Sequence, residues 1–206
     1  MKVIVFANDT QWNELTNNRT GIDWQKVDDY NDFNKYTDAD AFFCLLQGFD
    51  VTAFKNLNKP VIINSTINSL NALKAPSNVL RINGWTTFLN RQTWEIAGKL
   101  NEQTIALFNR LNIKIQNVAD EPGFIAARVI AMIINEAYFA LGEDVSSKKE
   151  IDIAMKLGTN YPYGPFEWGA LIGEENILLL LQKLSETDTR YLPADFLVTE
   201  VKNKKA

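Results

Sequence analysis

DEPGFIAARVIAMIINEAYFALG, residues 120–142, is the stretch that decides the fold. Its apolar run from 124 to 141 is interrupted by three strongly polar residues, Arg128, Asn135 and Glu136. Their spacings of seven and eight residues indicate a single polar stripe on a helix with about 3.6 residues per turn. We therefore expect a helix buried nearly all round, in a core or a subunit contact. The mid-helix charges after a Pro-Gly entry favour an interior helix over a membrane span.

Two further helices are predicted after this one. Ser147 and Glu150 form a capping box that starts a helix over Lys148–Leu157, and Gly158 is expected to close it. Pro165 suits the first position of a third, short helix. An all-α C-terminal domain follows from this pattern.

The string KLGTNYPYGPFEWGALIG, residues 156–173, is more specific than helix physics demands. With residues 120–142 it resembles the C-terminal domain of the 3-hydroxyacyl-CoA dehydrogenase family. That domain reads D-x-PGFI-x-NR, then EA in the same helix, then ID-x-AMKLG and YP-x-GPFE. The positions that match in register are Asp120, Pro122, Gly123, Phe124, Ile125, Arg128, Glu136, Ala137, Ile151, Asp152, Ala154 to Gly158, Tyr161, Pro162 and Gly164 to Glu167.

The composition excludes several classes of function. The 206 residues are 46% hydrophobic with a net charge of -4 and no long basic run, so nothing favours nucleic acid. The single cysteine, Cys44, forbids an intrachain disulfide and suits a reducing cytoplasm. With no histidine, the chain lacks the commonest general base and metal ligand, so we expect no metal site.

The first half of the chain alternates short apolar runs with helix-length segments. Strands are expected at 2–6, 22–27, 41–46, 61–64, 79–82, 94–96 and 113–118, and helices at 9–15, 51–56, 69–74 and 101–111. Such alternation predicts an α/β domain with a mostly parallel sheet. We place a reduced Rossmann-like domain at residues 1–119 and the helical domain at 120–206.

The resemblance to the family extends weakly into this half. ADAFF at 39–43, VIINSTINSL at 61–70 and the ungapped register from Arg81 to Ile96 are similar to family segments. The resemblance implies that Asn83 stands where the family has the histidine that takes the substrate proton, with Glu95 at the carboxylate that orients it. Asn68 and Thr86 correspond to the substrate-contacting Ser and Asn, and Ala127 to another polar Asn.

The expected cofactor site departs further from the family. A Rossmann domain needs glycines after its first strand so that the pyrophosphate can approach the backbone. The residues there are ANDTQW, 7–12, in which Asn8 and Asp9 occupy the phosphate positions and Trp12 adds bulk. Cys44 stands where the family has a Glu near the nicotinamide ribose, and its apolar flanks indicate a small buried side chain.

We therefore expect a non-catalytic relative that keeps the fold, with an acyl-CoA cleft and no NAD. It would pair as a homodimer through the helical domain and serve as a binding or regulatory subunit, with no membrane association. One alternative is an active NAD-dependent oxidoreductase on 3-hydroxyacyl-CoA thioesters in fatty acid metabolism, with Glu95 or a water replacing the imidazole. The other is a purely structural partner of a true dehydrogenase.

Overall fold

The structure is a computed structural model that describes residues 1–204. It divides into two compact units, one of Met1–Phe124 and one that begins at Ile125. The sequence placed this division before Asp120. That residue lies in the first unit, where its carboxylate accepts hydrogen bonds from the backbone N–H groups of Leu70 and Asn71.

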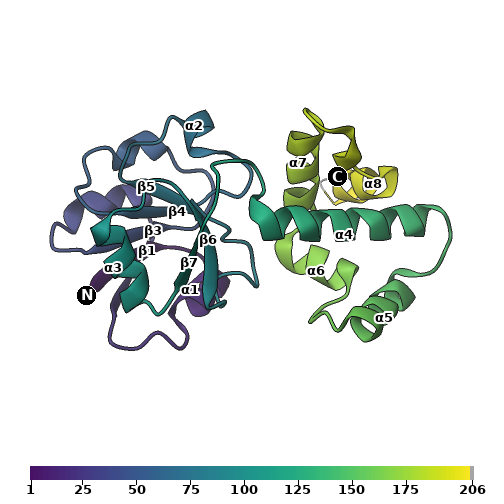
Figure 1. Ribbon diagram of the computed structural model, residues 1–206, viewed down its shortest axis with the longest axis horizontal. Helices are drawn as coiled ribbons and strands as arrows, with labels where there is room; N and C mark the ends of the chain where they lie inside the picture. Colours follow the sequence, from purple (N-terminus) through teal and green to yellow (C-terminus); the bar gives the residue numbers. More distant parts are fainter. Residues whose placement is uncertain (205–206) are drawn as a thin grey trace. The chain divides into compact units, whose positions relative to one another are not determined.

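The first unit is an α/β domain (Figure 1). Its described strands are β1 (Lys2–Phe6), β2 (Asp23–Val27), β3 (Ala41–Cys44), β4 (Val61–Asn64), β5 (Val79–Ile82), β6 (Thr93–Ala97) and β7 (Lys114–Asn117). Its helices are α1 (Asp9–Thr16), α2 (Leu70–Leu73) and α3 (Glu102–Arg110), with 3₁₀ helices η1 (Tyr30–Lys35) and η2 (Val51–Phe54). All the predicted strands and helical segments are present, although the helix predicted at 51–56 is a 3₁₀ helix.

The strands form one sheet in the order β2-β1-β3-β4-β5-β6-β7. Every neighbouring pair is parallel except β5 and β6, which confirms the mostly parallel, Rossmann-like sheet. The chain passes from β1 to β2 on one side and returns to β3 on the other. The carboxyl ends of β1 and β3 therefore mark the switch point, where sheets of this type bind their ligands.

Apolar side chains cover both faces of the sheet. Alternate residues of β1 point to opposite faces, so Val3 and Val5 join one core and Ile4 the other. Leu15 of α1 and Phe108 of α3 complete the first core. The second core is closed by residues of η1, η2 and the loops around them. A continuous apolar run such as 41–45 follows from burial on both sides.

The second unit is all-α, as predicted. Its described helices are α4 (Phe124–Gly142), α5 (Lys148–Thr159), α6 (Pro165–Ile172), α7 (Glu174–Ser185) and α8 (Asp195–Asn203), with a 3₁₀ helix η3 at Thr189–Tyr191. Ser147 caps α5 and Pro165 begins α6, as the sequence indicated. Gly158 does not close α5. The helix continues to Thr159, and Asn160 ends it in a left-handed conformation with φ of 55°.

The sequence motif that joins α5 to α6 in the helical unit has a packing explanation. The buried carboxylate of Asp152 accepts the backbone N–H groups of Phe166, at 2.8 Å, and Glu167, at 3.2 Å, and so caps the start of α6. A Cβ on Gly164 would lie 2.3 Å from Asp152 Oδ1, so glycine is required there. Asp152 in one helix and the Gly-Pro entry of the next therefore form one structural unit.

Helix α4 is less buried than the sequence indicated. By length and composition it could cross a membrane, but 44% of its apolar window is buried inside the protein. Asn135 is buried and bonds Leu192 O and Ala194 N, whereas Glu136 is exposed, because consecutive helical residues differ by about 100°. The single polar stripe is thus wrong. Helix α4 is only partly buried within its own chain, and the subunit contact that the sequence also allowed stays a prediction.

Candidate functional site

The first turn of α1 follows β1 at the switch point. Asn8 caps the helix through its Oδ1, which accepts the N–H of Gln11 at 2.8 Å, while Gln11 Oε1 accepts the N–H of Asn8 at 3.3 Å. The reciprocal bonds satisfy backbone donors that a bound anion would otherwise meet.

Carboxamide side chains connect the start of α1 with the ends of β3 and β4. Gln11 Nε2 donates to Leu45 O at 2.9 Å, and Asn64 Nδ2 donates to the same oxygen at 3.1 Å. Gln47 Nε2 donates to Asn64 O at 3.1 Å. Gln11 is 8% exposed and Asn64 is 4% exposed, so these amides belong to the interior. The chain's own side chains thus connect α1, which begins at the switch point, with the ends of β3 and β4.

The other residues at the expected cofactor positions have local roles. Asp9 is exposed and pairs with Lys26 of β2, with 2.5 Å between Oδ1 and Nζ, and this contact lowers the pKa of Asp9. Trp12 packs against the core that Leu15 completes. Cys44 is fully buried, and burial raises the pKa of its thiol, so it is not a thiolate nucleophile.

These residues do not fit a dinucleotide. Positions 7–12 contain no glycine, the helix terminus is capped by its own side chains, and an acidic group stands beside it. A pyrophosphate needs close backbone approach and unsatisfied N–H groups at this place.

Asn83 lies just beyond β5, 8% exposed. Its Oδ1 accepts the hydroxyl of Thr66 and the backbone N–H of Trp85, both at 3.3 Å. The antiparallel register pairs Ile82, the last residue of β5, with Ile96. Asn83 follows Ile82 in the chain, and Glu95 precedes Ile96 in β6. A joint role for Asn83 and Glu95, which the family resemblance implied, stays a prediction.

The remaining predicted site residues differ in accessibility. Asn68 is exposed in the loop after β4, and its backbone oxygen accepts the Ser65 hydroxyl at 2.7 Å. Thr86 is half-buried after Asn83. Ala127 is fully buried in α4 and offers no hydrogen bond from its side chain. Asn68 is thus available to a ligand, whereas Ala127 is a core residue.

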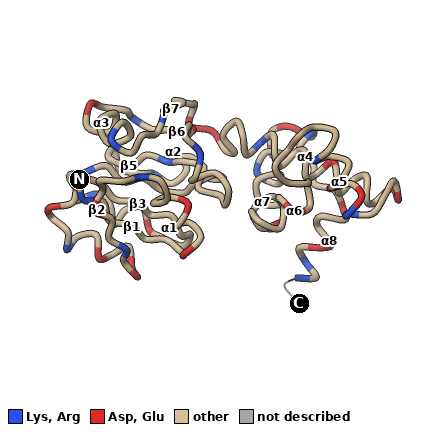
Figure 2. Tube along the Cα trace, turned by 90° about the horizontal axis from the view of Figure 1, so that it is seen from below, with Lys and Arg blue, Asp and Glu red and all other residues tan. Residues whose placement is uncertain are grey.

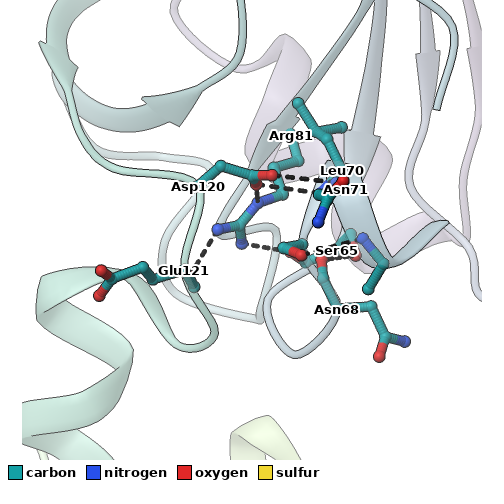
Figure 3. Close-up of polar contacts among 9 residues, drawn as sticks. Ser65, Asn68, Leu70, Asn71, Arg81, Asp120 and Glu121 are labelled. Carbon is teal, nitrogen blue, oxygen red and sulfur yellow. Dashed lines mark hydrogen bonds and ion pairs between the residues drawn. The ribbon is translucent and has the colours of Figure 1, made fainter. Parts of the chain in front are cut away.

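A buried ion pair holds the loop that carries Asn68 (Figure 3). Arg81 is fully buried, and its Nε lies 2.5 Å from Asp120 Oδ1. Its Nη1 donates to Ser65 O at 3.0 Å and its Nη2 to Glu121 O at 2.5 Å. Burial opposes ionisation of Asp120, but two backbone N–H groups and Arg81 outweigh it and lower the pKa of that carboxyl.

A second acidic group holds the segment after Asn83. The carboxylate of Glu14, in α1, accepts the N–H of Thr87 at 2.8 Å and 3.0 Å. Burial raises the pKa of Glu14, and hydrogen bonds and the charge of Arg91 oppose this only in part. Thr87 has φ of 79°, a strained backbone for a β-branched residue. Glu14 therefore stabilises an unusual turn next to Asn83.

Sequence reasoning missed Arg81, Gln11 and Glu14. A lone Arg inside the apolar strand VLRI is a signal that a buried charge needs a partner. Gln11 and Glu14 gave no such signal, because their partners lie across the sheet and far along the chain.

Lys and Arg are interspersed with Asp and Glu along both units (Figure 2).

Known proteins match the helical half of the chain most strongly. Residues 123–206 match the family model described as the 3-hydroxyacyl-CoA dehydrogenase C-terminal domain. The chain is 48% identical to 3-hydroxyadipyl-CoA dehydrogenase of Escherichia coli K12 over 85 residues, 40% of this chain and 18% of that protein. It is 37% identical to 3-hydroxybutyryl-CoA dehydrogenase of Clostridioides difficile over 100 residues, 47% of this chain and 36% of that protein. The matches thus span well under half of these relatives.

The fold comparison extends to the α/β unit. The crystal structure of (S)-3-hydroxybutyryl-CoA dehydrogenase from Ralstonia eutropha superposes with a TM-score of 0.72 at 24% identity, covering 88% of this chain and 71% of that one. The fold is therefore shared across most of the chain, and the resemblance seen in the sequence is confirmed.

Proposed function

Because residues 123–206 match the C-terminal domain of the 3-hydroxyacyl-CoA dehydrogenase family, we propose that this chain is a non-catalytic member of it. It would bind an acyl-CoA thioester without NAD and act as a binding or regulatory subunit. The observation that carries this proposal is the bond from Gln11 Nε2 to Leu45 O, by which the protein's own amide joins the start of α1 to the residue that follows β3 at the switch point. In sheets of this type the dinucleotide binds at that place.

The chemistry at Asn83 supports the same proposal. A general base must accept a proton near neutral pH, and a carboxamide has no useful basicity. Both of its oxygen lone pairs already accept hydrogen bonds, from Thr66 and Trp85. Asn83 can therefore hold a ligand through its amide N–H but cannot remove a proton from it.

The alternative is an active oxidoreductase on 3-hydroxyacyl-CoA thioesters. The observation in its favour is Glu95, a carboxylate in β6 next to Ile96, which pairs with the residue before Asn83. Burial lowers the pKa of Arg91, and the charges of Glu95 and Glu14 offset this lowering only in part. The carboxylate of Glu95 would have to act as the base in the absence of any imidazole.

The proposed partner is a second copy of the chain, bound through α4. Ile125, Val129 and Phe139 are 59%, 52% and 41% exposed, and their positions fall within about 80° around the helix. Such a face suits a self-complementary contact in a symmetric dimer. We also propose a reducing, cytoplasmic location, which a free buried Cys44 tolerates.

The test is hydride transfer in both directions. The protein is assayed at 340 nm with 3-hydroxybutyryl-CoA and NAD, and with acetoacetyl-CoA and NADH. We expect no turnover above a protein-free control, while an active family member assayed in parallel gives turnover.

Glu95→Gln separates true activity from contamination. Turnover that disappears in this variant would overturn the proposal in favour of the oxidoreductase, with Glu95 as the base. Turnover that is unchanged by it would come from a contaminating enzyme and would be removed by further purification.

A further inference from the structure

Asn83 and Gly84 form the one Asn-Gly pair in the sequence. In such a pair the backbone nitrogen of the glycine can attack Cγ of the asparagine, because glycine has no Cβ to obstruct the approach. A bond forms between that nitrogen and Cγ, the bond from Cγ to Nδ2 breaks, and ammonia leaves with the proton of the backbone N–H. Water then opens the five-membered imide and leaves aspartate or isoaspartate. The local sequence therefore encodes a deamidation site.

The fold leaves the side chain of Asn83 prepared for this reaction. The hydroxyl of Thr66 and the N–H of Trp85 both donate to Asn83 Oδ1 at 3.3 Å. Donors aimed at a carbonyl oxygen stabilise the negative charge that develops on it when its carbon is attacked. Within residues 1–204, Asn83 Nδ2 is the one buried side-chain nitrogen or oxygen that makes no hydrogen bond. The leaving nitrogen is thus held by no contact of its own.

One contact opposes the reaction at the attacking atom. Gly84 N donates to Asn64 Oδ1 at 3.0 Å, in the interior of the protein. A backbone nitrogen attacks only after it has given up its proton, and an N–H bound to a buried acceptor is shielded from the solvent base that removes it. Asn64 is itself fixed, because it is 4% exposed and its Nδ2 donates to Leu45 O at 3.1 Å. Asn64 thus restrains the nucleophile.

The same contact explains why glycine occupies position 84. A Cβ there would lie 2.6 Å from Asn64 Cγ and 2.7 Å from Asn64 Cβ, so no larger residue fits beside Asn64. The packing that requires glycine therefore creates the reactive pair, and the hydrogen bond from Gly84 to Asn64 restrains it.

We propose that Asn83-Gly84 is a deamidation site that the fold keeps closed, with Asn64 as the positioning residue that holds it. The inference does not depend on the binding of a CoA thioester or of NAD. Its consequence lies at the candidate site, because deamidation replaces an amide, which has no useful basicity, by a carboxylate, which accepts protons. Opening of this turn therefore changes the chemistry of the position as well as its packing.

Peptide mass spectrometry measures the reaction directly. Trypsin cleaves after Arg81 and Arg91 and releases residues 82–91 as one peptide, in which fragmentation separates Asn83 from Asn90. The folded protein, incubated in mildly alkaline buffer, should convert Asn83 far more slowly than the urea-unfolded chain does. Equal rates in the two states would overturn the proposal.

Three variants separate the hydrogen bond from a general loosening of the site. Asn64→Leu removes the acceptor of the Gly84 N–H, and conversion should accelerate about fivefold, the ratio that one neutral hydrogen bond gives. Asn64→Asp keeps an oxygen at this position and should convert no faster than the wild type. Gln11→Leu removes the other side-chain donor to Leu45 O, leaves Gly84 untouched and should keep the wild-type rate.

The role of Asn64 is overturned if Asn64→Leu shows no acceleration. It is equally overturned if Asn64→Asp or Gln11→Leu accelerates the conversion as much as Asn64→Leu does, because the acceptor of the Gly84 N–H is then not the cause.

Hydrogen exchange at Gly84 decides the matter even if Asn64→Leu fails to fold. In the wild type the Gly84 N–H should exchange more slowly than in the unfolded chain. Low concentrations of urea should accelerate this exchange and the conversion of Asn83 by the same factor, because both begin with loss of the bond to Asn64. A Gly84 N–H that exchanges as in the unfolded chain, while Asn83 stays intact, would show that another contact protects the pair.

Discussion

The fully buried guanidinium of Arg81 lies 2.5 Å from the carboxylate of Asp120, so a central strand of the sheet is tied to the segment that ends the first unit. The same guanidinium bonds Ser65 O and packs over the ring of Phe124 at 4.3 Å. One buried cation thus organises the loop after β4 and the residues that precede α4.

Removal of Asp120 should therefore be costly. Asp120→Asn leaves Arg81 buried without its counter-charge, and we expect the free energy of unfolding of the first unit to fall by about 3 kcal/mol. This is the lower end of the usual range, because the Asp120 side chain keeps 29% exposure. Urea titration followed by tryptophan fluorescence measures it, since Trp12, Trp24, Trp85 and Trp94 all lie in this unit.

The double variant Arg81→Met, Asp120→Asn provides the control for this pair. If the two residues stabilise one another, its loss should be clearly smaller than the sum of the two single losses. Additive losses would show that each side chain contributes through its backbone hydrogen bonds alone.

Glu14 should give a pH dependence of opposite sign to Asp120. The folded-state pKa of Glu14 is raised by burial above its ordinary 4.5, so its contribution to stability is fully present below 4.5 and is lost as pH rises through the folded pKa. The free energy of unfolding of wild type minus that of Glu14→Gln should therefore decrease as pH rises above 4.5. Because Asp120 is present in both proteins, its contribution to the pH dependence cancels in this difference. A difference that increases with pH would show that Glu14 is stabilised as a carboxylate.

Glycine at 164 should be essential for the helical unit. In Gly164→Ala the new Cβ meets Asp152 at 2.3–2.4 Å, and we expect the free energy of unfolding to fall by about 1–3 kcal/mol. Gly158→Ala is the matched control: nothing lies within 4 Å of its Cβ, and the residue is inside α5. There alanine should be neutral or stabilising by up to about 1 kcal/mol. Trp168 fluorescence reports on this unit, and equal losses in both variants would contradict the contact.

The exposed face of α4 predicts self-association. Val129→Glu places a charge in that face and should convert a dimer into a monomer, as measured by light scattering after size exclusion. Lys149→Gln changes the net charge by the same amount at an exposed position of α5 and should leave the dimer intact. A wild-type protein that is monomeric at all concentrations would remove the basis of the proposal.

The inner strands β3 and β4 could be predicted because they are buried on both faces and read as nearly continuous apolar runs, as VIIN at 61–64 does. The edge strands β2 and β7 are largely exposed and carry polar residues. The helical unit could be predicted because its caps and its Pro-Gly entries are local in sequence. The polar contacts could not, since the bond from Gln11 to Leu45 depends on β1 and β3 being neighbours, and the contact of Glu14 with Thr87 joins residues far apart in the chain.

The candidate site was predicted in part. The family resemblance selected Asn83, directly after β5, and Glu95, within β6, and their role as a pair stays a prediction. It gave no sign that Asn83 Nδ2 would be buried without a partner, because that depends on which atoms Thr66 and Trp85 bind. The sequence could not show how much of α4 its own chain covers. An apolar residue does not reveal whether it packs against the same chain or against another copy.

Titration of the wild-type protein with NADH, followed by the fluorescence of the nicotinamide and by calorimetry, tests the central claim most directly. If the amides of Asn8 and Gln11 have replaced the phosphate site, no saturable signal should arise up to about 1 mM NADH, a concentration that would reveal even about 4 kcal/mol of binding free energy. Saturable binding in the micromolar range would contradict it.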